Sequence, residues 1–250
     1  MSERKAYVIM LISIPVLWIA VVQITGVPSF LLPGPDLVAK VLWQERDIFV
    51  FNASVTVMEA LVGYTIANII AVGLAIGFLY ITGLECFTTP WMVVVRNIPF
   101  LAIAAILVIT LGDTPAPKII IVVLVCFFPI LINVTKGLKA ADSVLLDRMR
   151  VLNASKWQIF TKVRWAIALP YYIAAHEIAF TGSIMGAILA EYMFASQGLG
   201  FIMVRALMQY RADRLYALTL IASILAISVY IFVKMVEKRL FQWKADDQRI

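Results

Sequence analysis

The sequence predicts an all-α, polytopic membrane protein with about six transmembrane helices. Of its 250 residues, 63% are hydrophobic and 14% are charged, whereas soluble domains average about 45–50% and about 25%. The apolar residues are gathered into stretches nearly free of charge, and a helix of about 20 such residues crosses the roughly 30 Å of bilayer hydrocarbon. Lipid is therefore expected to cover most of the surface.

Six apolar segments supply the expected spans, and they cover residues 7–25, 55–82, 90–111, 119–135, 171–194 and 215–233. Prolines at positions 28, 33 and 35 end the first helix, and Asp36 then caps a short amphipathic helix. The longest polar stretch, residues 136–165, lies between the fourth and fifth segments. It is too amphipathic to span a bilayer, so we expect a sizeable loop there.

The distribution of Lys and Arg predicts the orientation, because cytoplasmic loops retain positive charge. With six spans, the N-terminus, the turn at Glu85, the 136–165 loop and the charged C-terminal tail fall on one side of the membrane. That side holds 14 of the 21 Lys and Arg residues, the opposite loops hold 6, and Arg96 lies inside a span. Both termini are therefore expected to be cytoplasmic.

Composition also argues against several classes of function. The net charge of +6 comes from basic residues beside apolar spans, which indicates anionic lipid headgroups as their partner and no nucleic acid. A single His and two unpaired cysteines, Cys86 and Cys126, provide no metal site, disulfide or catalytic cluster. We therefore expect neither an enzyme nor a bound cofactor. The sequence also lacks a Gly-x-x-x-x-Gly-Lys-[Ser/Thr] phosphate loop, so nucleotide chemistry would have to come from a partner.

The loop itself reads as a helix-turn-helix. Its first helix carries apolar residues at helical spacing, Asn153 tolerates the left-handed backbone of a turn, and Ser155 can cap a second helix that contains Trp157 and Phe160. Such a unit can lie on lipid or dock in a groove of a partner protein. Its bend and its mixture of acids and bases favour the protein partner.

This loop resembles the EAA coupling motif of bacterial ABC importer permeases, and within them the nitrate, sulfonate and taurine group. Asp147 stands at the motif's Glu position, Asn153 at its Gly position, and residues 154–160 match the stretch that follows. Two positions that are usually Ala hold Arg148 and Met149 here, and a single Leu-Pro step remains at 169–170.

The resemblance extends over nearly the whole chain. Its other parts are Leu-Pro-Gly-Pro at 32–35, Arg-Asn-Ile-Pro at 96–99, the aromatic and apolar run at 127–133, Ala-Glu at 190–191 and Gly-Leu-Gly at 198–200. It implies one transmembrane permease domain over residues 1–250, of the type I importer fold, with 136–165 as its cytoplasmic coupling loop. The expected location is a bacterial or archaeal inner membrane.

The resemblance also implies partners. A second copy or a paralogous permease would complete the translocation path, separate ATPase subunits would bind ATP and Mg, and an extracytoplasmic solute-binding protein would deliver the solute. The group points to a small anionic solute such as nitrate, a sulfonate or taurine. A pyrimidine precursor, riboflavin or bicarbonate are alternatives, and a secondary transporter or channel subunit is the rival class.

Two sets of site residues follow. The ATPase-docking set is Asp147, Arg150, Leu152, Asn153, Ala154, Ser155, Trp157 and Phe160. Within it, Leu152, Trp157 and Phe160 are expected to be the buried anchors and the charges to set the register.

The possible path or gate residues are Arg96, Asn97, Pro99 and Glu191, because charges and helix breaks inside spans mark function by default. Arg96 could attract an anion or cap carbonyls freed by Pro99. Glu191 could hold the connection at 198–200 or meet the binding protein. Glu59 is expected to reach water, and Glu177 to reach water or pair with Arg164.

Overall fold

The computed structural model describes residues 3–240, and their side chains from residue 13 onward except 194, 236, 238 and 240. The charged tail at 241–250 lies outside the described residues. Every regular element in the described part is helical, and the helices are α1 (Glu3–Thr25), α2 (Pro35–Gln44), α3 (Arg46–Tyr80), α4 (Leu84–Asn97), α5 (Phe100–Leu111), α6 (Pro115–Lys139), α7 (Ser143–Val151), α8 (Lys156–Ile159), a π-helical turn (Phe160–Arg164), α9 (Trp165–Phe194), α10 (Leu199–Met208) and α11 (Ala212–Leu240).

Four of these helices are long and apolar enough to cross a membrane: α3, α6, the continuous helix Lys156–Met193 and Ala212–Met235 of α11. The bent pair α4 and α5 raises the number to five, and the described apolar part of α1, Ser13–Thr25, is shorter than a span. The predicted all-α membrane architecture is thus confirmed, with four to five spans on these criteria where six were expected.

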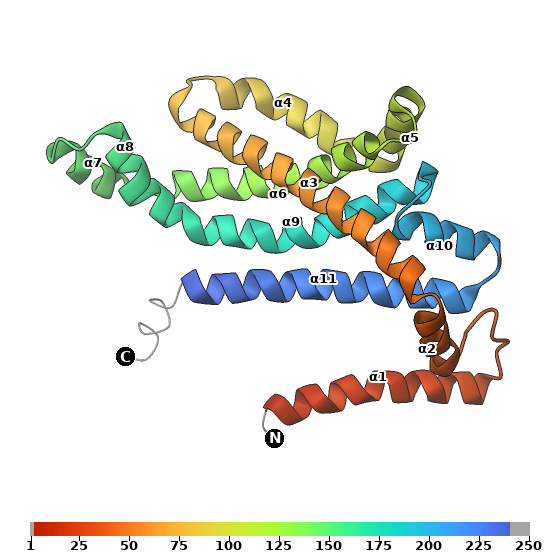
Figure 1. Ribbon diagram of the computed structural model, residues 1–250. Coiled ribbons are helices and arrows are strands. Elements are labelled where there is room, and N and C mark those ends of the chain that lie inside the picture. The colour runs from red at the N-terminus through yellow and green to blue at the C-terminus, as the bar shows by residue number, and fades with distance from the viewer. Residues whose placement is uncertain (1–2, 241–250) are drawn as a thin grey trace.

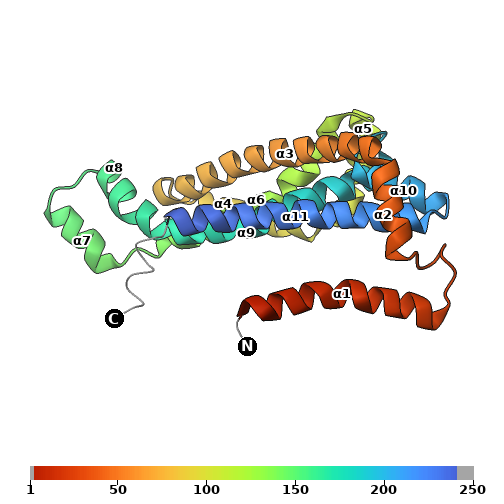
Figure 2. The same ribbon diagram turned by 60° about the horizontal axis from the view of Figure 1, so that its bottom comes forward.

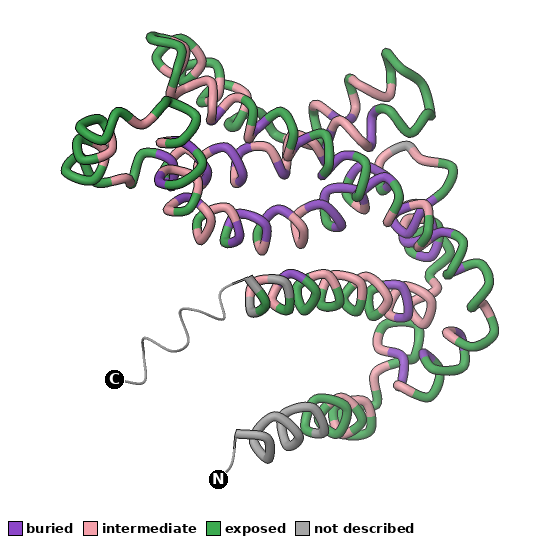
Figure 3. The backbone as a smooth tube through the Cα atoms, turned by 60° about the vertical axis from the view of Figure 1, so that its left-hand side comes forward, coloured by how far each residue is buried: buried purple, intermediate pink, exposed green. Residues whose placement is uncertain are grey.

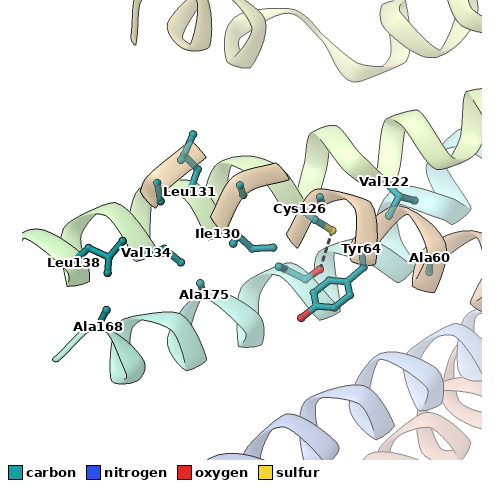
Figure 4. Packing of buried hydrophobic residues seen from close by; sticks show 14 of the residues in the cluster. Ala60, Tyr64, Val122, Cys126, Ile130, Leu131, Val134, Leu138, Ala168 and Ala175 are labelled. Carbon is teal, nitrogen blue, oxygen red and sulfur yellow. Dashed lines mark hydrogen bonds between the residues drawn. The ribbon is translucent and has the colours of Figure 1, made fainter. Parts of the chain in front are cut away.

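The core lies where α3, α6 and α9 pack against one another (Figures 3 and 4). Helix α3 contributes a row of fully buried alanines, and α6 contributes larger side chains such as Ile130 and Leu131. The Cys126 thiol donates a hydrogen bond to the Ala179 carbonyl at 3.2 Å. Gly63 has no room for a side chain, since a Cβ there would lie 2.6 Å from Val122. Small residues thus allow these helices to approach closely, as is typical of membrane bundles.

The third expected span is not one straight helix. Helix α4 ends at Asn97, and α5 starts at Phe100 and is turned by 90° from it. Pro99 has no backbone N–H and disfavours helical backbone at the residue before it, and Ile98 accordingly lies in the extended region at φ −76° and ψ 130°. The expected third span over 90–111 is therefore bent at the helix break that Pro99 indicated in the sequence.

The second expected span begins earlier than predicted. Helix α3 starts at Arg46 and not near residue 55, and it has 35 residues. Glu59 therefore lies well inside the helix, where only 6% of its surface is exposed. The expectation that Glu59 reaches water was wrong.

Less of the 136–165 segment stands apart from the long helices than predicted. Helix α6 continues to Lys139, and from Lys156 the chain is already helical and runs through the π-helical turn into α9. Only α7 and its two short connections therefore stand outside the long helices.

The long helices run between two ends of the molecule (Figures 1 and 2). We call residues 140–157, which contain α7, the α7 end, and residues 195–214, which contain α10, the α10 end. The turn between α3 and α4 lies near the α7 end, because Glu85 forms an ion pair with Lys139 at the end of α6. The predicted grouping of that turn with the 136–165 loop on one side fits this geometry.

Candidate functional site

The α7 end forms a hairpin of two short helices that projects beyond the bundle (Figures 1 and 2). Asp142 caps α7 by accepting a hydrogen bond from the Val144 amide at 3.2 Å. The chain then reverses at Asn153, whose φ is +56°. The predicted left-handed turn at Asn153 is therefore confirmed, and the Ala154 amide closes the turn on the Met149 carbonyl at 3.0 Å.

The second half of the hairpin starts with a capping box. The Ser155 hydroxyl accepts from the Gln158 amide at 3.2 Å, and the Gln158 side chain accepts from the Ser155 amide at 2.8 Å. This reciprocal pair satisfies two N–H groups that a helix start leaves without partners. The predicted helix-turn-helix, with Ser155 as its cap, is thus confirmed.

Large apolar side chains are exposed at the tip of this hairpin. Leu152 is 75% exposed and Trp157 is 70% exposed, and Val151 beside them is 86% exposed. Two of the charged residues here are paired with each other, because Arg150 binds Asp147 at 2.8 Å across one helical turn. The tip therefore offers an apolar surface with an internally neutralised acid and base next to it.

Phe160 does not belong to that surface, although we expected it to be a docking anchor. It is only 8% exposed and joins the core cluster of α3, α6 and α9. Its ring lies 5.7 Å from that of Trp157, 6.0 Å from that of Trp165 and 6.5 Å from that of Tyr80 in α3. Because the helix continues unbroken into α9, Phe160 faces α3 and Trp157 remains outside.

The path candidates lie around the break between α4 and α5. The Asn97 side chain donates to the Val93 carbonyl at 2.7 Å, and Pro99 stands at the start of α5. Arg96 is exposed, and its guanidinium makes no hydrogen bond or ion pair with any residue that the structure describes. Asn97, and not Arg96, therefore bonds a carbonyl of α4. Arg96 lines a cavity of about 400 Å³ between α4, α5, α6 and α9.

Glu191 lies elsewhere, at the α10 end, with only 1% of its surface exposed. Its carboxylate accepts a hydrogen bond from the Gly200 amide at 2.8 Å. The Gly198 amide donates to the Asn52 side chain at 2.8 Å, and the Leu199 amide donates to the Thr56 hydroxyl at 2.9 Å. Glu191 therefore holds the connection at 198–200, which was one of its two expected roles, and it does not line the cavity beside Arg96.

Buried acids beside this cap distinguish the α10 end further. Oxygen atoms of Glu59 and Glu191 are buried without a hydrogen-bond partner in the described part of the chain. Lys118, itself 5% exposed, forms an ion pair with Asp113 in the turn between α5 and α6. That bond holds the pKa of Asp113 below its usual range.

Several of these residues were not singled out from the sequence. Asn52 and Thr56 are polar residues one helical turn apart in an apolar helix, and this spacing was the signal that could have marked them. Their partners, the amides at 198–199, could not be read from that spacing.

The expected pairing of Glu177 is not the observed one. Glu177 pairs with Lys234 of α11 and not with Arg164, whose guanidinium donates to the Leu138 carbonyl at 2.8 Å. His176 is buried and bonds the Tyr64 hydroxyl at 2.6 Å.

Comparison with known families gives these features a context. Residues 69–242, which include the bent pair, the hairpin and α10, match the family described as binding-protein-dependent transport system inner membrane component. The chain belongs to this family. It is accordingly a transmembrane ABC transporter permease, a transport subunit and not a catalytic one.

Individual relatives cover almost the full chain. A riboflavin transport system permease protein of Chloroflexus aurantiacus is 26% identical, with 92% of this chain and 87% of the relative aligned. A putative aliphatic sulfonates transport permease protein of Bacillus subtilis is also 26% identical, over 92% and 86%. Among solved structures, the inward-facing MetNI methionine ABC transporter matches with a TM-score of 0.58 at 17% identity, over 79% of this chain and 98% of the other. The structural match shows that the fold is shared.

Proposed function

We propose that this chain acts as a single permease domain of an ATP-driven importer and receives the work of ATP hydrolysis through the hairpin at the α7 end. The observation that carries this proposal is the exposure of Leu152 and Trp157 on a rigidly capped hairpin. ATP and Mg would be bound by separate ATPase subunits. A second copy or a paralogue would complete the path, and a solute-binding protein would deliver the solute.

The hairpin has the properties of a docking element. Interface energy concentrates in a few large side chains that lose contact with water on binding. Leu152 and Trp157 are such side chains, and the turn at Asn153 and the box at Ser155 fix their positions before any partner arrives. A preorganised element loses less conformational entropy when it binds. Within residues 3–240 no other segment covers these two side chains, and the hairpin projects beyond the long helices (Figure 2).

The hairpin would lie in the cytoplasm, together with both termini. The excess of Lys and Arg on that side supports this orientation. Impermeant thiol reagents test it in intact cells that express a Cys86→Ser, Cys126→Ala background. A cysteine at Asp36 should react from outside and one at Lys156 should not, and the reverse pattern would invert the topology.

The solute is proposed to be a small anion. Arg96 supplies an unpaired positive charge beside a broken span, and one relative is named for aliphatic sulfonates. Another relative is named for riboflavin, so riboflavin or a pyrimidine precursor is the alternative class. Uptake of radiolabelled taurine, nitrate and riboflavin by cells with and without the chain separates these classes.

Docking is tested with the double variant Leu152→Ala, Trp157→Ala. Losing a hot-spot side chain weakens association by about 2 kcal/mol or more, which is roughly a 30-fold change in Kd. ATPase subunits that purify with the wild-type chain, measured by their ATP hydrolysis, should therefore be lost from the variant. Trp43→Ala is the matched control, because Trp43 is 72% exposed but lies in α2, near the α10 end. Full association and solute-stimulated hydrolysis in the double variant would refute docking at the hairpin.

A further inference from the structure

The cavity beside Arg96 combines apolar walls with a single positive charge. Six of its eight lining residues are apolar, one is the cation Arg96 and one is the amide Asn133. Its volume of about 400 Å³ falls within the roughly 300–1,000 Å³ of ligand sites. No acidic side chain lines it. The charge of Arg96 is therefore not neutralised inside the cavity.

The polar groups at the cavity have different degrees of freedom. Asn133 donates its amide N–H to the Pro129 carbonyl at 2.8 Å, which fixes the orientation of its side chain. The Arg96 guanidinium has five donors and no described partner. Arg96 belongs to the last turn of α4, where a cation also interacts favourably with the helix dipole. A cation at any position in the last turn of α4 would interact with the helix dipole in this way. The dipole therefore does not explain why the charge lies at the cavity.

We propose that this cavity is a solute subsite that takes an organic anion, with its sulfonate or carboxylate on Arg96 and an aliphatic or aromatic body between Phe100, Phe128 and Ile132. This inference rests on the proposed importer function and narrows its solute class. Arg is suited to the head group, because its planar fork matches two oxygens of an anion at once. The apolar walls supply the remaining affinity by removing the body of the solute from water.

The size of the cavity separates this class from a small inorganic anion. A water molecule occupies about 30 Å³ in the liquid, and an ion of a few atoms such as nitrate would leave most of a 400 Å³ cavity filled with water against Phe100 and Phe128. Water beside apolar walls contributes nothing to selectivity. An apolar body attached to the anion fills that space.

A second hollow in the same molecule serves as an internal contrast. It measures about 510 Å³ between α9, α10 and α11, and no charged side chain lines it. Its hydroxyls at Thr219 and Ser223 donate to carbonyls of their own helix at 2.9 and 2.8 Å. This larger hollow can accommodate an apolar molecule such as a lipid chain, but it has no cation to select an anion.

The first test measures how the positive charge of Arg96 affects the reaction of charged reagents inside the cavity. A single cysteine replaces Ile132 in a Cys86→Ser, Cys126→Ala background, in the chain assembled with its ATPase. Anionic sulfonatoethyl and cationic trimethylammonioethyl methanethiosulfonates are compared by reaction rate. Arg96→Gln should lower the ratio of anionic to cationic rates about tenfold, and Arg96→Lys should keep the ratio near its original value.

The control cysteine is Ser223→Cys in the uncharged hollow, where Arg96→Gln should leave the ratio unchanged. An equal change of the rate ratio at both cysteines would mean that Arg96→Gln has disturbed the fold. The rate ratio of the Ile132→Cys thiol in Arg96→Lys would then be the deciding measurement. A ratio at Ile132 that does not depend on the charge at position 96 overturns the proposal. So does a cysteine at 132 that reacts with neither reagent.

The second test addresses the organic body. Benzenesulfonate should slow the reaction of the Ile132→Cys thiol with neutral N-ethylmaleimide when Arg96 is present, and should lose this protection in Arg96→Gln. Nitrate and benzyl alcohol at the same concentration should protect at least tenfold less. Equal protection by nitrate refutes the organic class. Retention of the ATPase during purification is measured separately. If the subsite proposal is wrong, protection is absent but the ATPase is retained; if the importer proposal is wrong, the ATPase is not retained.

Discussion

The two ends of the molecule use their side chains in opposite ways. At the α10 end, Asn52, Thr56 and Glu191 are all less than 9% exposed and bond backbone amides from within. At the α7 end, the caps at Asp142 and Ser155 stabilise a hairpin whose largest apolar side chains face outward. At one end, buried polar side chains bond the backbone amides of another element. At the other, caps fix a hairpin tip whose apolar side chains stay exposed.

The adjacent aromatics Trp157 and Phe160 provide the sharpest test of this contrast, and the largest expected effect. Phe160→Ala should lower the free energy of unfolding by about 3 kcal/mol, because it leaves a cavity in the core. Trp157→Ala should leave stability nearly unchanged and reduce only ATPase association. Reversible unfolding in mixed detergent and sodium dodecyl sulfate gives the stabilities. Equal loss of stability in both variants would contradict the division between core and tip.

At the α10 end, Gly200→Ala is expected to cost about 2 kcal/mol of unfolding free energy. A Cβ at Gly200 would lie 2.8 Å from the Cβ of Glu191 and even closer to the Ile188 carbonyl, so the helices would have to separate. Gly73→Ala is the matched control, because nothing lies within 4 Å of its Cβ position. That control should be neutral or slightly stabilising. A normal melting temperature in the Gly200 variant would show that α10 is held loosely.

At the α7 end, Asn153→Val should destabilise the turn by about 1–2 kcal/mol, because a β-branched residue is strained at a φ of +56°. Asn153→Gly should be tolerated, since glycine adopts this backbone freely. Because the hairpin is separate from the core, we expect faster proteolysis at 140–155 and weaker ATPase association, with the global melting temperature unchanged. A lower global melting temperature would show that the hairpin and the core unfold together.

The smallest effect is expected at Asp113. The hydrogen bond from Lys118 lowers the pKa of this carboxyl, so the folded protein favours its charged form. The resulting stabilisation is present above the ordinary Asp pKa of about 3.9 and is lost as the pH falls through the lower value of the folded state. Asp113→Asn should therefore lower the melting temperature by a few degrees at pH 6 and by less at pH 3. If the melting temperatures of Asp113→Asn and the wild type differed by the same amount at pH 6 and pH 3, the lowered pKa of Asp113 would be contradicted.

The same contrast explains what the sequence could predict. The hairpin depends on neighbours in sequence, so Asn153 and Ser155 could be assigned from residue type and spacing alone. The cap of α10 joins residues 143 and 146 positions apart, and no local pattern pairs Thr56 with Leu199 or Asn52 with Gly198. Phe160 was misassigned for a related reason. Its burial depends on Tyr80 in another helix, and its spacing from Trp157 fits a docking face equally well.

The continuous helix Lys156–Met193 has 38 residues, which at 1.5 Å per residue gives a rod of about 57 Å, nearly twice the roughly 30 Å of bilayer hydrocarbon. Trp157 stands near one tip of this helix and Glu191 near the other, with the π-helical turn and Pro170 between them. The wider π-helical turn at Phe160–Arg164 sets the rotational phase between these tips. Removing one residue from that turn would restore regular winding and swing Trp157 by about 100° around the rod axis.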